Sequence, residues 1–109
     1  MLRFTDKTIN KMDEKFLLIN IVGLLYLLEI DTISIDEAEK ILFSPYICKM
    51  LSDKGCSGKI VELLWKACEL EDIKSLIPDY YYESIVEIKN EAIMLFRKYE
   101  IFDKERWLE

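Results

Sequence analysis

The sequence contains no histidine among its 109 residues. Without an imidazole there is no Ser-His or Cys-His pair, because the base that would activate the nucleophile is missing. Zinc would have to be held by thiolates and carboxylates alone, and the Glu-x-x-His pairs of carboxylate di-iron bundles are absent. No pair of acids stands out for acid–base work. We therefore expect no catalytic, cofactor-binding or metal-binding residue, and no enzyme activity.

Cysteine is also scarce, with Cys48, Cys56 and Cys68 separated by 8 and 12 positions. An odd number of cysteines without a CxxC pair argues against a disulfide framework and against a thiolate metal site. Reduced thiols fit the cytoplasm, which is the expected location. Cys56 lies next to an expected helix N-terminus, where the pKa of a thiol can fall, so a reactive thiol there is an alternative.

Glycine and proline number only three and two. Turn-rich β architectures use more of both, whereas the abundant Leu, Ile, Lys and Glu favour helices. A chain of this length has room for one domain of ordinary size. The composition therefore predicts an all-α protein with a single helical domain over residues 1–109.

Two kinds of surface are missing as well. The net charge is −6, and only the segment Lys40–Lys59 is weakly basic. Nucleic-acid binders usually carry a basic stripe, and an acidic chain is repelled by phosphate and by anionic lipid. The longest apolar run is also shorter than the roughly 20 residues that a membrane span needs. We expect neither a nucleic acid nor a membrane as a partner.

The most apolar segment is Phe16–Ile30, in which twelve of fifteen residues are Leu, Ile, Val, Phe or Tyr. Its length favours a helix, although two strands joined near Gly23 are the alternative. A soluble helix that is apolar on every face should be buried on most sides. We therefore expect a central core helix here, with a neighbouring helix close to Gly23.

Helix boundaries are marked along the rest of the chain. Ser, Asp and Gly stand at positions typical of caps, and two prolines fall where helices begin or stop. These signals are Ser34 with Glu37, Ser44-Pro45, Gly55, Ser57, Pro78 and Asp79. They predict a bundle of about five helices around Phe16–Ile30, of which the last runs from Tyr80 to about Phe102.

The run Tyr80-Tyr81-Tyr82 is the most unusual local feature. Three consecutive helical residues cannot all face the core, and Tyr81 is the one that continues the apolar stripe, so Tyr80 or Tyr82 should be exposed. Residues 62–91 around the run carry eight acids and three lysines. Exposed tyrosine among acids is typical of a binding patch, although tyrosine can also lie over the core edge with its hydroxyl in water. The candidate partner-binding residues are Tyr80, Tyr82, Asp79, Glu83, Glu71 and Asp72.

Four stretches carry a family resemblance: Ile19–Glu29, Ile33–Tyr46, KGCS at 54–57 and ELEDIKSLIP at 69–78. In these stretches the chain resembles a family of short bacterial proteins known only as a domain of unknown function. The resemblance implies a small bacterial cytoplasmic protein. It supplies no activity and no functional residue.

Three kinds of function remain as hypotheses. The first is a small acidic interaction module, for example an immunity or antitoxin-type protein, which binds a basic protein partner. The second is a small-molecule-binding protein or minor enzyme with a pocket between helices. The third is a homodimer built on leftover apolar surface. An exposed acidic and aromatic surface would favour the first, and a bound cofactor or metal would favour the second.

Overall fold

Within residues 8–99, the part of the chain that the computed structural model describes, every regular element is a helix. The helices are α1 (Lys11–Glu29), α2 (Ile35–Ile41), α3 (Pro45–Asp53), α4 (Gly58–Cys68), α5 (Leu70–Leu76) and α6 (Tyr81–Phe96), and the 3₁₀ turn η1 (Pro78–Tyr80) precedes α6. The predicted all-α class is confirmed, and no strand junction occurs at Gly23. The expected continuation of the last helix to Phe102 lies outside the described residues.

Several helix ends lie where the sequence predicts them. The side chain of Ser34 accepts a hydrogen bond from the Glu37 backbone N–H at the start of α2. Ser44 does the same for Ile47 at the start of α3, with Pro45 in the first helical turn. Gly55 follows α3 with a φ of +85°, a conformation that glycine adopts without steric cost.

Ser34→Ala is expected to lower the free energy of unfolding by about 1 kcal/mol, because the Glu37 N–H loses its acceptor. Urea unfolding followed by circular dichroism would measure the loss. Ser75→Ala is the matched control, since Ser75 is exposed inside α5 and alanine is the better helix former. Equal midpoints for Ser34→Ala and the parent would show that this cap contributes nothing.

Two expected caps are absent, and one helix boundary was not predicted. The Ser57 side chain makes no cap hydrogen bond at the start of α4. No boundary signal was read between Ser57 and Pro78, but the chain turns at Glu69 between α4 and α5. The turn is consistent with packing, since Leu70 is buried beside the residues of α4. Asp79 does not cap the last helix, because it lies inside η1 and no side-chain cap bond is present at the start of α6.

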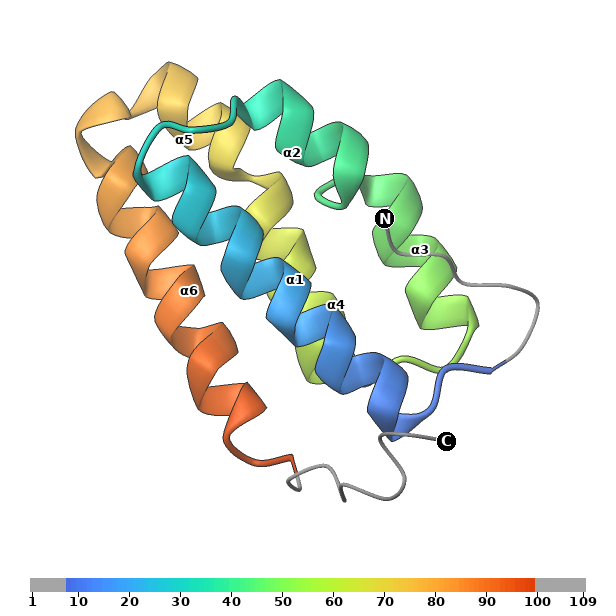
Figure 1. Ribbon diagram of the computed structural model, residues 1–109. Coiled ribbons are helices and arrows are strands. Elements are labelled where there is room, and N and C mark those ends of the chain that lie inside the picture. The colour runs from blue at the N-terminus through green and yellow to red at the C-terminus, as the bar shows by residue number, and fades with distance from the viewer. Residues whose placement is uncertain (1–7, 100–109) are drawn as a thin grey trace.

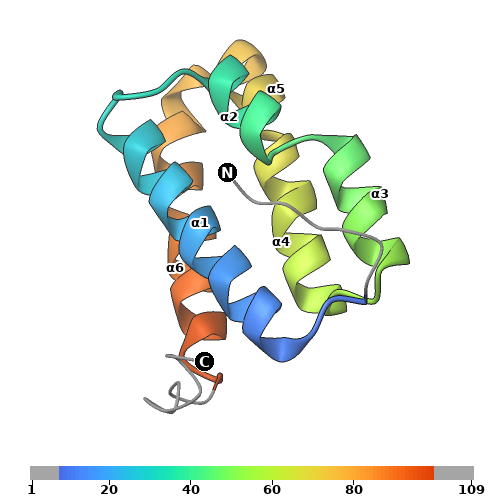
Figure 2. The same cartoon turned by 45° about the vertical axis from the view of Figure 1, so that its right-hand side comes forward.

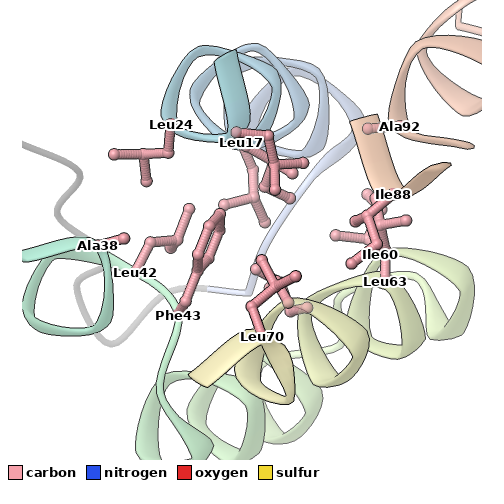
Figure 3. Close-up of a cluster of buried hydrophobic side chains, with 14 of the residues drawn as sticks. Leu17, Leu24, Ala38, Leu42, Phe43, Ile60, Leu63, Leu70, Ile88 and Ala92 are labelled. Carbon is pink, nitrogen blue, oxygen red and sulfur yellow. The ribbon is translucent and has the colours of Figure 1, made fainter. Parts of the chain in front are cut away.

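The core lies between α1 on one side and α2, α4 and α6 on the others. Figure 3 shows Leu17 and Leu24 of α1 facing Leu42 and Phe43, with Leu70 below them. Ile60, Leu63, Ile88 and Ala92 fill the space between α4 and α6. Figures 1 and 2 show that α1 and α6 run side by side in opposite directions, and α1 makes its most extensive helix contact with α6.

The segment Phe16–Ile30 is not enclosed as a buried central helix. Its inner face is in the core, but Asn20 and Gly23 are exposed, and the side chains of Ile19 and Tyr26 are 46% and 51% exposed. A chain of this size buries only about 60–70% of its unfolded surface, so its other helices cannot surround α1. The described residues include no helix that could span a membrane.

Candidate functional site

The three consecutive tyrosines open α6 at one end of the molecule. Tyr81 is buried, as its place in the apolar stripe predicts, and its ring meets that of Tyr82 edge to face at a centroid distance of 5.1 Å. Tyr80 is 56% exposed, and Tyr82 is also exposed. The expectation that at least one of the outer tyrosines reaches solvent is confirmed.

Tyr82 makes a specific contact within the chain. Its hydroxyl donates to the Asp31 carboxylate, with Oδ1 and Oδ2 at 2.6 and 2.8 Å. This hydrogen bond raises the pKa of Tyr82, since the carboxylate favours the protonated phenol. The contact joins the start of α6 to the connection between α1 and α2. Tyr82 therefore holds two parts of the fold together and is less free than Tyr80 to contact a partner.

An apolar group next to Tyr80 was missed by the sequence analysis. Leu76 at the end of α5 is 78% exposed, and Ile77 is also exposed. Together with Asp79 these residues form what we call the α5–α6 corner, defined as Leu76, Ile77, Asp79 and Tyr80. The signal in the sequence was Pro78. A helix usually ends before a proline, and the apolar residues at such a helix end need not continue the buried stripe.

Carboxylates gather at the other end of α5. Asp36 and Glu39 of α2 and Glu71 of α5 have oxygen atoms within 4.8 Å of one another, and we call these three residues the carboxylate cluster. Partial burial, the hydrogen bond with Glu71 and the surrounding negative charges raise the pKa of Glu39. Within residues 8–99 this is the group of three ligating side chains close enough to share a cation, but its members lie at the surface, where acidic groups are common without an ion.

The predicted partner-binding residues are divided between the two ends of α5. Glu71 and Asp72 begin the helix near α2, whereas Asp79, Tyr80, Tyr82 and Glu83 lie around the start of α6. The ends of α5 are about 9 Å apart, at a rise of 1.5 Å per residue. Figure 2 shows α5 beside α2 at this end of the molecule. The structure thus places the six residues on one end of the fold, but in two groups.

The three thiols are poorly placed to act as nucleophiles. Cys56 is buried, and burial together with the charge of Glu14 raises its pKa to about 12. The sulfur atoms of Cys48 and Cys68 lie 3.7 Å apart between α3 and α4, and burial raises the pKa of both. Because the thiolate is the nucleophilic form, these pKa shifts argue against Cys56 as a reactive residue.

An open groove of about 660 Å³ runs between α4 and α6. Its walls mix lysine, glutamate and apolar side chains, including Lys59, Glu62, Lys66, Glu87, Glu91 and Met94. Lys66 Nζ lies 2.9 Å from Glu91 Oε2, which links the two helices by an exposed ion pair. Ligand pockets are usually enclosed and mostly apolar, so this groove only weakly resembles one.

Comparison with known proteins adds a family but no function. The model of a family described as "Protein of unknown function (DUF3969)" matches residues 8–109. No curated protein matches the chain, and no solved structure does. The surface described above is therefore the basis for a functional proposal.

Proposed function

Since the chain belongs to the DUF3969 family, whose description assigns no activity, we propose its role from the surface of the molecule. The protein is an interaction module that binds a basic protein partner through the α5–α6 corner. An immunity or antitoxin-type protein, which covers a basic surface of a toxin, would act in this way. The single observation that carries the proposal is the exposure of Leu76, Ile77 and Tyr80 within five consecutive residues, close in sequence to Asp79 and Glu83.

The apolar part of the corner would supply the affinity. The side chains of Leu76 and Tyr80 are 78% and 56% exposed, although leucine and tyrosine are often buried in protein cores. A few large side chains near the centre of an interface usually contribute most of the binding energy, and tyrosine is frequent among them. Removal of these side chains from water by a partner would stabilise the complex.

The acidic residues would orient the basic partner and raise the rate at which it associates. Asp79 and Glu83 lie beside Tyr80, and the carboxylate cluster lies at the far end of α5. The raised pKa of Glu39 reflects partial burial and crowded negative charge, and the charge repulsion would be relieved by a lysine or arginine of a partner. Charges of one sign also steer an oppositely charged partner and raise the association rate.

The test is quantitative capture of a partner with the full chain as bait. Leu76→Ala and Tyr80→Ala are expected to weaken the complex by about tenfold or more each, since truncation of a central anchor typically costs 2 kcal/mol or more. Met94→Ala is the matched control, because Met94 is also highly exposed but lies on the α4–α6 groove. The on-rate should fall with added salt, because exposed charges are screened.

Tyr82→Phe separates the two tyrosines. It removes only the hydroxyl that contacts Asp31, so binding should persist if Tyr80 is the anchor. A captured protein that is acidic would contradict the proposal, as would binding that Leu76→Ala and Tyr80→Ala leave unchanged. A salt-independent on-rate would remove the role assigned to the acids.

The second candidate is small-molecule binding in the α4–α6 groove. The observation in its favour is the volume of about 660 Å³ with cationic and anionic side chains on facing helices. A ligand found by mass spectrometry of the protein as purified, whose binding Lys66→Ala abolishes, would support this function over the first. This function is the second candidate because the groove is open and Cys56, the alternative reactive thiol, is buried and does not line the groove.

A further inference from the structure

Helix α1 has a second apolar face that no other part of the described chain covers fully. We call it the outer stripe, and its members are Met12, Phe16, Ile19, Gly23, Tyr26 and Ile30. They follow one another in alternating steps of four and three, which is the spacing of a coiled-coil seam. None carries a charge, and each is exposed or only partly buried.

Gly23 lies in the middle of the stripe, and no neighbour within residues 8–99 accounts for it. Glycine is unfavourable in a helix interior, so it usually marks a position where something comes close. A Cβ built at Gly23 would meet nothing within 4 Å among the described residues, so the neighbouring helix that was expected close to Gly23 is not found within residues 8–99. A helix from another molecule could approach the backbone at this point.

The order of large and small residues in the stripe suits a second copy of the same helix. In an antiparallel pair centred between Ile19 and Gly23, Ile19 of each copy lies against Gly23 of the other. The same register places Phe16 against Tyr26 and Met12 against Ile30. A twofold axis makes each of these contacts twice, as in other isologous dimers.

The charges around the stripe fit the same arrangement. Lys11 and Arg97 lie at one end, because α6 runs antiparallel to α1 and the Lys11 ammonium is 5.9 Å from the ring of Tyr99. Asp31 and Glu83 lie at the other end, where Tyr82 contacts Asp31. Lys89 also lies at this end, where it is paired with Glu29, and its ammonium is 5.7 Å from the ring of Tyr26. A twofold axis would bring the basic end of one copy to the acidic end of the other. This match matters for a chain of net charge −6, whose copies would otherwise repel each other.

We propose that the outer stripe is the interface of a homodimer, in which α1 packs antiparallel against α1 of a second copy. From Met12 to Ile30 the stripe is about 27 Å long, at a rise of 1.5 Å per residue. The contact is one helix wide, so a reversible, concentration-dependent dimer is expected. The outer stripe and the α5–α6 corner have no residue in common, although Glu83 lies near both, and the failure of one proposal leaves the other standing.

Sedimentation velocity of the full chain from micromolar to millimolar concentration tests the proposal. The wild type should shift from the 13.0 kDa monomer to twice that mass. Ile19→Gln and Gly23→Gln should each raise the dimer dissociation constant by about tenfold or more. The first removes the apolar side chain that packs against the other copy, and the second fills the space beside Gly23 that this side chain would occupy. Met94→Gln, at an exposed apolar residue on another face, should leave the constant unchanged.

Gly23→Gln has a second readout that separates association from damage to the fold. Glutamine is the better helix former, and no residue from 8 to 99 opposes a side chain there. The melting temperature at micromolar concentration, where the monomer dominates, should therefore hold or rise while dimerisation weakens. A lower melting temperature together with weaker association would contradict this assignment of Gly23.

Carbodiimide cross-linking tests the antiparallel register. The expected product joins the Lys11 amine to the Asp31 carboxylate in the covalent dimer, as read by mass spectrometry. Within one chain these groups lie at opposite ends of α1, about 30 Å apart, so the link can form only between copies. A wild type that stays monomeric up to millimolar concentration overturns the proposal. The same holds for a monomer that binds phosphatidylglycerol vesicles through the stripe. So does a dimer that neither stripe variant weakens.

Discussion

Leu25→Asp is expected to leave the chain largely unfolded. Leu25 is fully buried on the inner face of α1, so the new carboxylate would lie in the core without a partner. The change removes a large apolar side chain, which costs about 2–5 kcal/mol, and adds the cost of a buried charge. Because small domains are stable by only about 5–15 kcal/mol, most of the helical circular dichroism should be lost at room temperature.

Ile19→Asp is the matched control for Leu25→Asp. It places the same charge on the same helix, but at a position that is 46% exposed on the opposite face. This variant should keep the helical spectrum and melt cooperatively, with a small loss of stability. A Leu25→Asp protein that melts like the parent, or an Ile19→Asp protein that unfolds, would show that the inner and outer faces of α1 have been assigned the wrong way round.

Glu14→Ala is expected to lower the free energy of unfolding by about 2–4 kcal/mol. Glu14 is a buried carboxylate on α1 whose Oε2 accepts a hydrogen bond of 2.6 Å from the Ser57 backbone N–H. Its Oε1 accepts the Tyr99 hydroxyl at 2.8 Å. The carboxylate therefore binds the residue that precedes α4, where negative charge is favoured, and connects this helix end with the turn that follows α6.

Removal of this carboxylate would leave two polar groups without their acceptor. Burial and the bond to Glu14 raise the pKa of Tyr99, because both favour the protonated phenol. Urea unfolding would measure the loss, and hydrogen exchange should accelerate first at the start of α4. Glu37→Ala, at an exposed glutamate in the first turn of α2, should cost far less. Equal losses for the two variants would contradict the role assigned to Glu14.

The sequence alone determined the fold class and many of the helix ends. Caps such as Ser34 and Ser44 act on backbone groups three residues away, and Gly55 acts at its own position. Tyr81 could likewise be assigned to the core, since the period of a helix decides which of three neighbours faces inward. These features are readable because each depends only on residues within about one helical turn.

Tertiary structure alone decided the contacts between distant segments. Ser57 was expected to cap α4 with its own side chain, but that side chain makes no cap hydrogen bond. The Ser57 backbone N–H donates to Glu14, 43 positions earlier. Tyr82 was a candidate for binding a partner, yet its hydroxyl donates to Asp31, 51 positions away. The apolar sequence of α1 could not show that its outer stripe is exposed. The sequence before Pro78 likewise could not show that Leu76 reaches solvent. Local sequence states which residues prefer burial, but the number and arrangement of the other helices determine which of them can be buried.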